Sequence, residues 1–127
     1  MKKYRMILEK TDTGFSAYSP DFPVFTTGDN MNEVLENSLE AFQLHFEDSQ
    51  TSINAGQIKL ELDFQQFFQY YSVINSRVLA EKIGMNPTLL SQYVSGKKKP
   101  SEAQCQRIVS GINQIGRELS ELKLTLN

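Results

Sequence analysis

The sequence predicts an α+β fold class, in which an N-terminal β-β-β-α-β module is followed by an all-α helix-turn-helix domain. Three observations predict it. Apolar and polar residues alternate in short runs of the first half, which is typical of strands. In the second half apolar residues recur every three or four positions, as in helices, and two short helical segments meet at a glycine. We expect the modules to span residues 1–64 and 65–127, with little linker between them.

Four strands and one helix are expected in the first half. Segments rich in β-forming residues are separated by Gly, Asp, Asn and Pro turns, and the last segment alternates most clearly. Asn30 is a good helix N-cap with Glu33 three residues on, and the helix that follows carries an apolar stripe that must cover the sheet. The expected strands are residues 4–10, 15–19, 24–27 and 58–64.

A helix, a glycine turn and a second helix are expected within residues 76–95. Gly84 ends the first helix as a C′ glycine should. Asn86 is a good N-cap, and Pro87 suits the first position of the second helix. The residues expected to face inward are Leu79, Ala80 and Ile83 from the first helix and Leu90, Tyr93 and Val94 from the second.

The second helix also has a polar face. Glutamine can pair bidentately with adenine and short hydroxyl side chains reach base edges, so this face suits readout of a DNA major groove, with Gln92 as the leading base contact. The lysines that follow the helix suit backbone phosphates, which position the protein rather than specify a sequence. The candidate DNA-binding residues are Thr88, Ser91, Gln92, Lys97, Lys98 and Lys99.

Four spaced positions of this stretch match a known pattern, and they are Ala80, Gly84, Leu90 and Gly96. The stretch thereby resembles the Cro and lambda-repressor class of DNA-binding domains. The resemblance implies that Thr88 and Gln92 meet bases, whereas Pro87, at a third such position, offers no side-chain hydrogen bond. The alternative is a compact helical bundle in which the lysines form a solvated loop.

The two halves of the chain carry opposite net charge. Residues 1–66 contain five Lys or Arg and eleven Asp or Glu, a net charge of −6, whereas residues 67–127 contain eight and four, a net charge of +4; the sum is −2. The basic half suits nucleic acid, and the acidic half suits a cationic protein. Solubility alone would also explain the acidic half.

Composition predicts a soluble, cytoplasmic protein with no membrane partner. No segment approaches the roughly 20 consecutive apolar residues that cross a bilayer, and the N-terminal residues lack the apolar core of a secretory signal. Cys105 has no second cysteine to pair with, and His45 lies far from it in sequence, so no metal-ligand spacing exists. No metal and no cofactor is implied.

A series of short motifs occurs in the first half: Gly14-Phe15, Ser19-Pro20-Asp21-Phe22-Pro23, Thr26-Thr27-Gly28-Asp29 and the Glu-rich residues 33–41. In this order they resemble the HicB antitoxin family of type II toxin-antitoxin systems, in which a helix-turn-helix appendage is also found. The resemblance covers about the first half of the chain. Val24 departs from the family pattern, which usually has glycine after the corner proline.

This resemblance implies an abbreviated RNase H-like fold and a function as an antitoxin. The N-terminal module would neutralise a small basic HicA-like toxin, an mRNA-cleaving ribonuclease, and the C-terminal part would repress its own operon by binding operator DNA. The candidate partner-binding residues are Asp21, Phe22, Phe25 and Asp29. Phe22 and Phe25 would contact a partner if exposed and would serve only the core if buried.

Two other functions remain open. The runner-up is a DNA-binding transcriptional regulator whose N-terminal module senses a ligand. The other is a metal-dependent nuclease, which needs several carboxylates that converge on Mg²⁺. Asp12, Asp21 and Asp29 lie in turns instead, and the glutamates of the first helix line a face that is more simply solvated. We therefore expect no catalytic residue and no enzyme.

A final helix is expected after Ser101, with an apolar seam of heptad-like spacing. Gly111 and Gly116 predict a break or kink within it. The seam would pack on its own domain or form a homodimer or higher oligomer, since helix-turn-helix proteins usually bind two half-sites. The seam residues are Cys105, Ile108, Ile112, Ile115, Leu119, Leu122 and Leu126.

Overall fold

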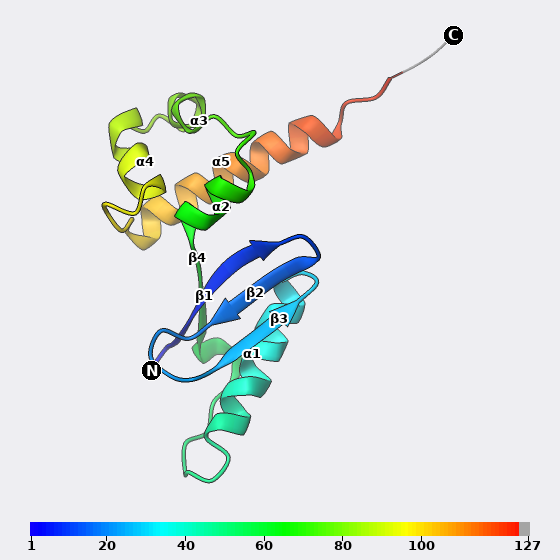
Figure 1. Ribbon diagram of the computed structural model, residues 1–127, viewed down its shortest axis with the longest axis vertical. Coiled ribbons are helices and arrows are strands. Elements are labelled where there is room, and N and C mark those ends of the chain that lie inside the picture. The colour runs from blue at the N-terminus through cyan, green and yellow to red at the C-terminus, as the bar shows by residue number, and fades with distance from the viewer. Residues whose placement is uncertain (125–127) are drawn as a thin grey trace. The chain divides into compact units, whose positions relative to one another are not determined.

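The computed structural model describes residues 1–124 (Figure 1). The chain divides into two compact units, unit 1 (Met1–Tyr70) and unit 2 (Tyr71–Asn127). The strands come first and most of the helices follow. Unit 1 contains β1 (Tyr4–Thr11), β2 (Gly14–Tyr18), β3 (Phe25–Gly28), α1 (Met31–His45), the short 3-10 helix η1 (Ala55–Gln57), β4 (Ile58–Leu62) and α2 (Phe64–Tyr70). Unit 2 contains α3 (Ser76–Ile83), α4 (Pro87–Val94) and α5 (Glu102–Ser120).

Unit 1 is built on one mixed four-stranded sheet with the order β3-β2-β1-β4. β1 and β2 form an antiparallel hairpin, and β3 pairs antiparallel with β2. β4 pairs parallel with β1, which requires a long crossover connection, and α1 provides it. β3 and β4 are therefore the two edge strands of the sheet.

The core of unit 1 lies between α1 and one face of this sheet. The alternating residues Tyr4, Met6 and Leu8 of β1 are buried there, against Val34 and Phe42 of α1. This is the period-two pattern of a sheet with one covered face. Asn30 N-caps α1 through its side chain, which accepts from the Glu33 amide at 2.9 Å, as the sequence predicted.

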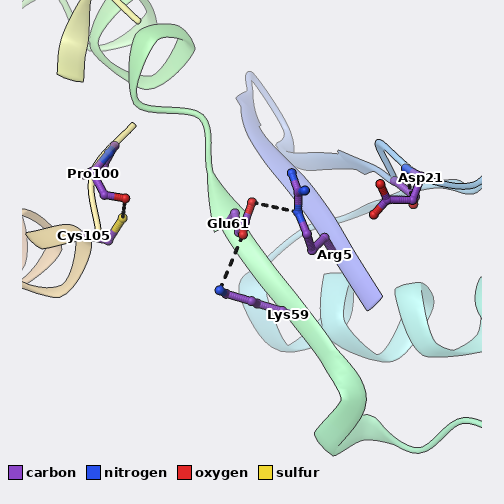
Figure 2. Close-up of polar contacts among 7 residues, drawn as sticks. Arg5, Asp21, Lys59, Glu61, Pro100 and Cys105 are labelled. Carbon is purple, nitrogen blue, oxygen red and sulfur yellow. Dashed lines mark hydrogen bonds and ion pairs between the residues drawn. The ribbon is translucent and has the colours of Figure 1, made fainter. Parts of the chain in front are cut away.

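The opposite face of the sheet carries the intervening residues. Their register places Phe25 beside Tyr18, Tyr18 beside Ile7, and Ile7 beside Glu61, in one row across all four strands. Glu61 is flanked by two cations (Figure 2): Arg5 Nε lies 3.4 Å and Lys59 Nζ 3.6 Å from its carboxylate. Charges therefore occupy the β1–β4 side of this face, and aromatic rings occupy the β2–β3 side.

The predicted fold class, with an all-α helix-turn-helix domain that begins at residue 65, is wrong. The residues expected to open that domain form α2, which belongs to unit 1 and packs beside β1. The Lys10 amide donates to Gln66 Oε1 and Gln66 Nε2 donates to the Lys10 carbonyl, each at 2.8 Å. The Tyr70 hydroxyl donates to Asp12 Oδ1, also at 2.8 Å. These bonds join residues far apart in sequence, so the helical pattern alone could not assign α2 to the sheet.

Unit 2 packs three helices around a small core. The buried residues are Leu79, Ala80, Met85, Leu90, Tyr93 and Ile108. The predicted break in the last helix is wrong, since α5 runs without interruption from Glu102 to Ser120. An ideal Cβ built on Gly111 would lie 2.3 Å from Ile83 Cγ2, so this glycine permits close packing of α5 on α3. Of the predicted seam, Leu126 lies outside the described residues.

A search of residues 1–124 finds no helix whose length and hydrophobicity would let it cross a membrane.

Candidate nucleic-acid interface

The turn between α3 and α4 is fixed by backbone and side-chain hydrogen bonds. Gly84 adopts a left-handed conformation with φ of 70° and ψ of 28°. Its amide donates to the Glu81 carbonyl, and the Met85 amide donates to the Ala80 carbonyl at 2.9 Å, which together form a Schellman motif. Asn86 Oδ1 accepts from the Thr88 amide at 2.8 Å and caps α4. The helix boundaries predicted around Gly84 and Asn86 are therefore confirmed.

The eight-residue helix α4 has two chemically different faces. Leu90 is fully buried and Tyr93 is nearly so, as the apolar spacing predicted. Thr88, Ser91 and Gln92 lie at i, i+3 and i+4, which places them together on one side of a helix. Thr88 and Ser91 are exposed, and Gln92 is half-buried. The helix thus presents two hydroxyls and one amide as a continuous polar strip.

A loop that contains three consecutive lysines follows α4 directly. Gly96, with φ of 81°, turns the chain after the helix. The Lys98 amide then donates to the Gln92 carbonyl at 3.1 Å, which holds the loop against the last turn of α4. The side chains of residues 97–99 are all exposed. The structure therefore brings the predicted polar strip and the predicted lysines to the same helix end.

Arg107 stabilises the position of this helix pair, and the sequence analysis missed it. Its guanidinium Nη2 donates to the carbonyls of Ile83 at 2.7 Å and Gly84 at 3.0 Å, across from α5 to the end of α3. A cation at a helix C-terminus also interacts favourably with the helix dipole. The contact joins residues more than twenty positions apart, so only the general preference for arginine near helix ends could have suggested it.

Phe22 belongs to the core of unit 1. Its ring packs against Phe46 at a centroid distance of 5.1 Å, against Tyr4 at 6.0 Å and against Phe42 at 6.1 Å. The turn that leads into Phe22 is stabilised by Ser19, whose hydroxyl accepts from the amides of Asp21 and Phe22. Asp21, drawn in Figure 2, is exposed at this corner. Of the two functions considered for Phe22, the packing supports a structural one.

Phe25 lies on the opposite face of the sheet and is 65% exposed. Its cross-strand neighbour Tyr18 is 40% exposed, so the two rings form an exposed apolar pair at the β3 edge. Asp29 is exposed just beyond β3. The four candidate partner-binding residues therefore do not form one surface. Tyr18 was missed, although the inward positions of Phe15 and Ala17 on the same strand already predict that it faces outward.

The lone cysteine and the lone histidine take part in local packing. Cys105 Sγ lies 3.9 Å from the Pro100 carbonyl, to which the thiol can donate (Figure 2). The His45 ring packs edge-on against Phe46 at 4.7 Å. Within residues 1–124 we find no cluster of three or more His, Cys, Asp or Glu side chains that could hold a metal ion.

A scan against models of known protein families gives no match, and a search of curated proteins finds no significant relative. The chemistry of the residues themselves must therefore carry any functional conclusion.

Proposed function

We propose that this protein binds double-stranded DNA through α4 and the lysine loop, and that it represses transcription by doing so. The observation that carries the proposal is the exposed polar strip on α4, which lies next to three exposed lysines. An α-helix fits the major groove, where glutamine can read adenine and hydroxyls can reach base edges. Lysines at the end of the same helix can then contact the phosphates beside that groove.

The distribution of charge supports this assignment. Unit 2 contains eight Lys or Arg and four Asp or Glu, a net charge of +4, whereas unit 1 contains five and eleven, a net charge of −6. Attraction to DNA is therefore concentrated in the unit that contains α4. The acidic unit 1 would be repelled by DNA and is the part suited to a cationic protein.

The second part of the proposal concerns unit 1. We infer that the chain is the antitoxin of a HicA/HicB-like toxin-antitoxin system and acts in the cytoplasm, where unit 1 neutralises a small basic mRNA-cleaving toxin. The motif order described above supports this inference, as do the acidic charge of unit 1 and the exposed Tyr18 and Phe25 pair. Aromatic residues are enriched at the centres of protein interfaces, so Phe25 is the side chain most suited to anchor the toxin.

The salt dependence of DNA binding tests the contribution of the lysine loop. For B-DNA each neutralised phosphate contributes roughly 0.9 to the slope of log K against log salt concentration. Replacement of Lys97, Lys98 and Lys99 by alanine should therefore lower this slope by up to about 2.7. A triple variant of Lys2, Lys3 and Lys59 changes the net charge equally and should leave the slope almost unchanged. An equal loss in both variants would show that only net charge matters.

Co-expression with the adjacent small open reading frame tests the antitoxin part. Intact protein should rescue growth and co-purify with the toxin, whereas Phe25→Glu should do neither while it still binds DNA. Leu44→Glu is the matched control, because Leu44 is equally exposed but lies on α1. If the neighbouring gene encodes no toxic protein, the antitoxin proposal fails and a ligand-sensing regulator becomes the better account.

A further inference from the structure

Pro87 lies on the same exposed side of α4 as the polar strip. It precedes Ser91 by four positions, which makes the two side chains neighbours on the helix surface. Pro87 is exposed, as are Thr88 and Ser91, whereas Leu90 on the other side of the helix is fully buried. An apolar ring therefore extends the strip of two hydroxyls and one amide at its first residue.

The ring of Pro87 differs in chemistry from the rest of this strip, because it carries only C–H groups. Thr88, Ser91 and Gln92 each offer a hydroxyl or an amide that can pair with a base edge. Proline offers neither a side-chain donor nor a backbone N–H. The distinctive apolar group of the major groove is the 5-methyl group of thymine. A polar base edge opposite Pro87 would lose its hydrogen bonds to water without replacement, which is unfavourable.

The chain around Pro87 is held in place by hydrogen bonds. The Asn86 side chain accepts from the Thr88 amide at 2.8 Å. In the turn before α4, the Gly84 carbonyl accepts from Arg107 Nη2 at 3.0 Å. The proline side chain itself loses almost no rotamer freedom when it is buried. An apolar contact by Pro87 therefore costs little conformational entropy on binding.

We propose that Pro87 reads the 5-methyl group of a thymine, so that the DNA recognised by α4 contains a T·A base pair near the adenine read by Gln92. This inference rests on the proposed binding of DNA by α4. Pro87 and Gln92 are five residues apart, which corresponds to about 7.5 Å along an α-helix. Successive bases of one strand are about 3.4 Å apart, so the thymine should lie within about three base pairs of that adenine.

Replacement of thymine by uracil tests the contact, because uracil pairs with adenine in the same way and lacks only the 5-methyl group. A duplex is selected from a random library with the full chain, and its thymines are then replaced one at a time. Loss of one buried methyl group should raise the wild-type dissociation constant about fourfold at the thymine that faces Pro87. At the same position, 5-methylcytosine should bind better than cytosine by a similar factor.

Variants of Pro87 and Thr88 assign the contact to one side chain. In Pro87→Ser the apolar ring is lost, so the thymine and uracil duplexes should bind equally well. Thr88→Ser is the matched control, since it removes an exposed methyl group from the same strip and keeps the hydroxyl. The difference between thymine and uracil should persist in this variant. Both positions are exposed, so both variants should fold, which circular dichroism verifies.

The position of the sensitive thymine is compared with that of the adenine, which is the base pair that Gln92→Ala no longer discriminates. A uracil effect that persists in Pro87→Ser would assign the methyl contact to another side chain and overturn the inference. A selected duplex without any uracil effect, or with one far from the adenine, would overturn this inference alone and leave DNA binding intact. Failure to select any duplex would overturn it together with the proposed function.

Discussion

The two units of this chain are stabilised in different ways. Unit 1 buries nine apolar residues between α1 and the sheet, and four aromatic rings of this region, Tyr4, Phe22, Phe42 and Phe46, pack in mutual contact. Within residues 71–124, unit 2 buries six apolar side chains beneath three helices. Because less apolar burial is available to unit 2, its caps and its close helix contacts carry a larger share of its stability. We expect core truncation to be most damaging in unit 1, and loss of single contacts at helix ends to matter in unit 2.

The largest expected effect is that of Phe42→Ala in unit 1. Phe42 is fully buried and contacts Tyr4 at a centroid distance of 5.3 Å, so its truncation should lower the free energy of unfolding by about 3–5 kcal/mol. Denaturant titration followed by residue-resolved NMR should show early unfolding of unit 1 and little change in unit 2. Leu44→Ala on the exposed side of α1 is the control. An equal shift of unit 2 would mean that the units unfold together.

The next effect concerns the two glycines of α5. A methyl group at Gly111 would press on Ile83, and overpacking of this kind costs about 1–3 kcal/mol. Gly116 has open space, so Gly116→Ala should gain up to about 1 kcal/mol from helix propensity. Thermal unfolding at low protein concentration should therefore show a lower melting temperature for Gly111→Ala and a higher one for Gly116→Ala than for wild type. Stabilisation by both would show that α5 does not pack closely on α3 at Gly111.

A smaller effect is expected from Arg107→Ala. The substitution removes two hydrogen bonds from α5 to the end of α3 and should destabilise unit 2 by about 1 kcal/mol. Arg117→Ala is the matched control, since the Arg117 guanidinium donates to Gln114 in its own helix. Hydrogen exchange of the α3 amides should accelerate in the first variant alone. Equal exchange in both variants would remove the capping role of Arg107.

The smallest effect is a gain in stability from Ser38→Ala. The Ser38 hydroxyl of α1 is fully buried and has no hydrogen-bond partner among the described residues. Burial of an unpaired hydroxyl is unfavourable, and alanine favours helix, so the free energy of unfolding should rise by about 0.5 kcal/mol. Ser110→Ala, at an exposed position of α5, should gain less. A loss of stability in Ser38→Ala would indicate that the hydroxyl has a partner.

Local structure was largely predictable from the sequence. The caps at Asn30, Gly84 and Asn86, the β-forming residues of β1 and the alternation along β4 depend on neighbouring residues, so their patterns are visible without a fold. The strand and helix limits nevertheless moved by one or two residues. The third strand is Phe25–Gly28 rather than residues 24–27, and β4 ends at Leu62.

Contacts between distant residues were not predictable in this way. Gln66 binds the backbone of Lys10, and this contact places α2 in unit 1 rather than with the helices that follow it. Gly111 lowers the helix propensity of α5 locally, but a larger residue at this position would collide with Ile83. The packing of α5 on α3 therefore favours glycine there. Phe22 and Phe25 lie only three residues apart, yet one ring is in the core and the other is exposed. Each of these outcomes depends on tertiary packing.

The most direct test of the central claim is the DNA affinity of Gln92→Ala. The full chain is first used to select duplexes from a random library, and dissociation constants are then measured for a selected duplex and for its scrambled sequence at one salt concentration. Gln92→Ala should lose about 1–3 kcal/mol on the selected duplex and little on the scrambled one, whereas Gln106→Ala on α5 should change neither. Failure to select any sequence, or an equal loss on both duplexes, would contradict readout of DNA by α4.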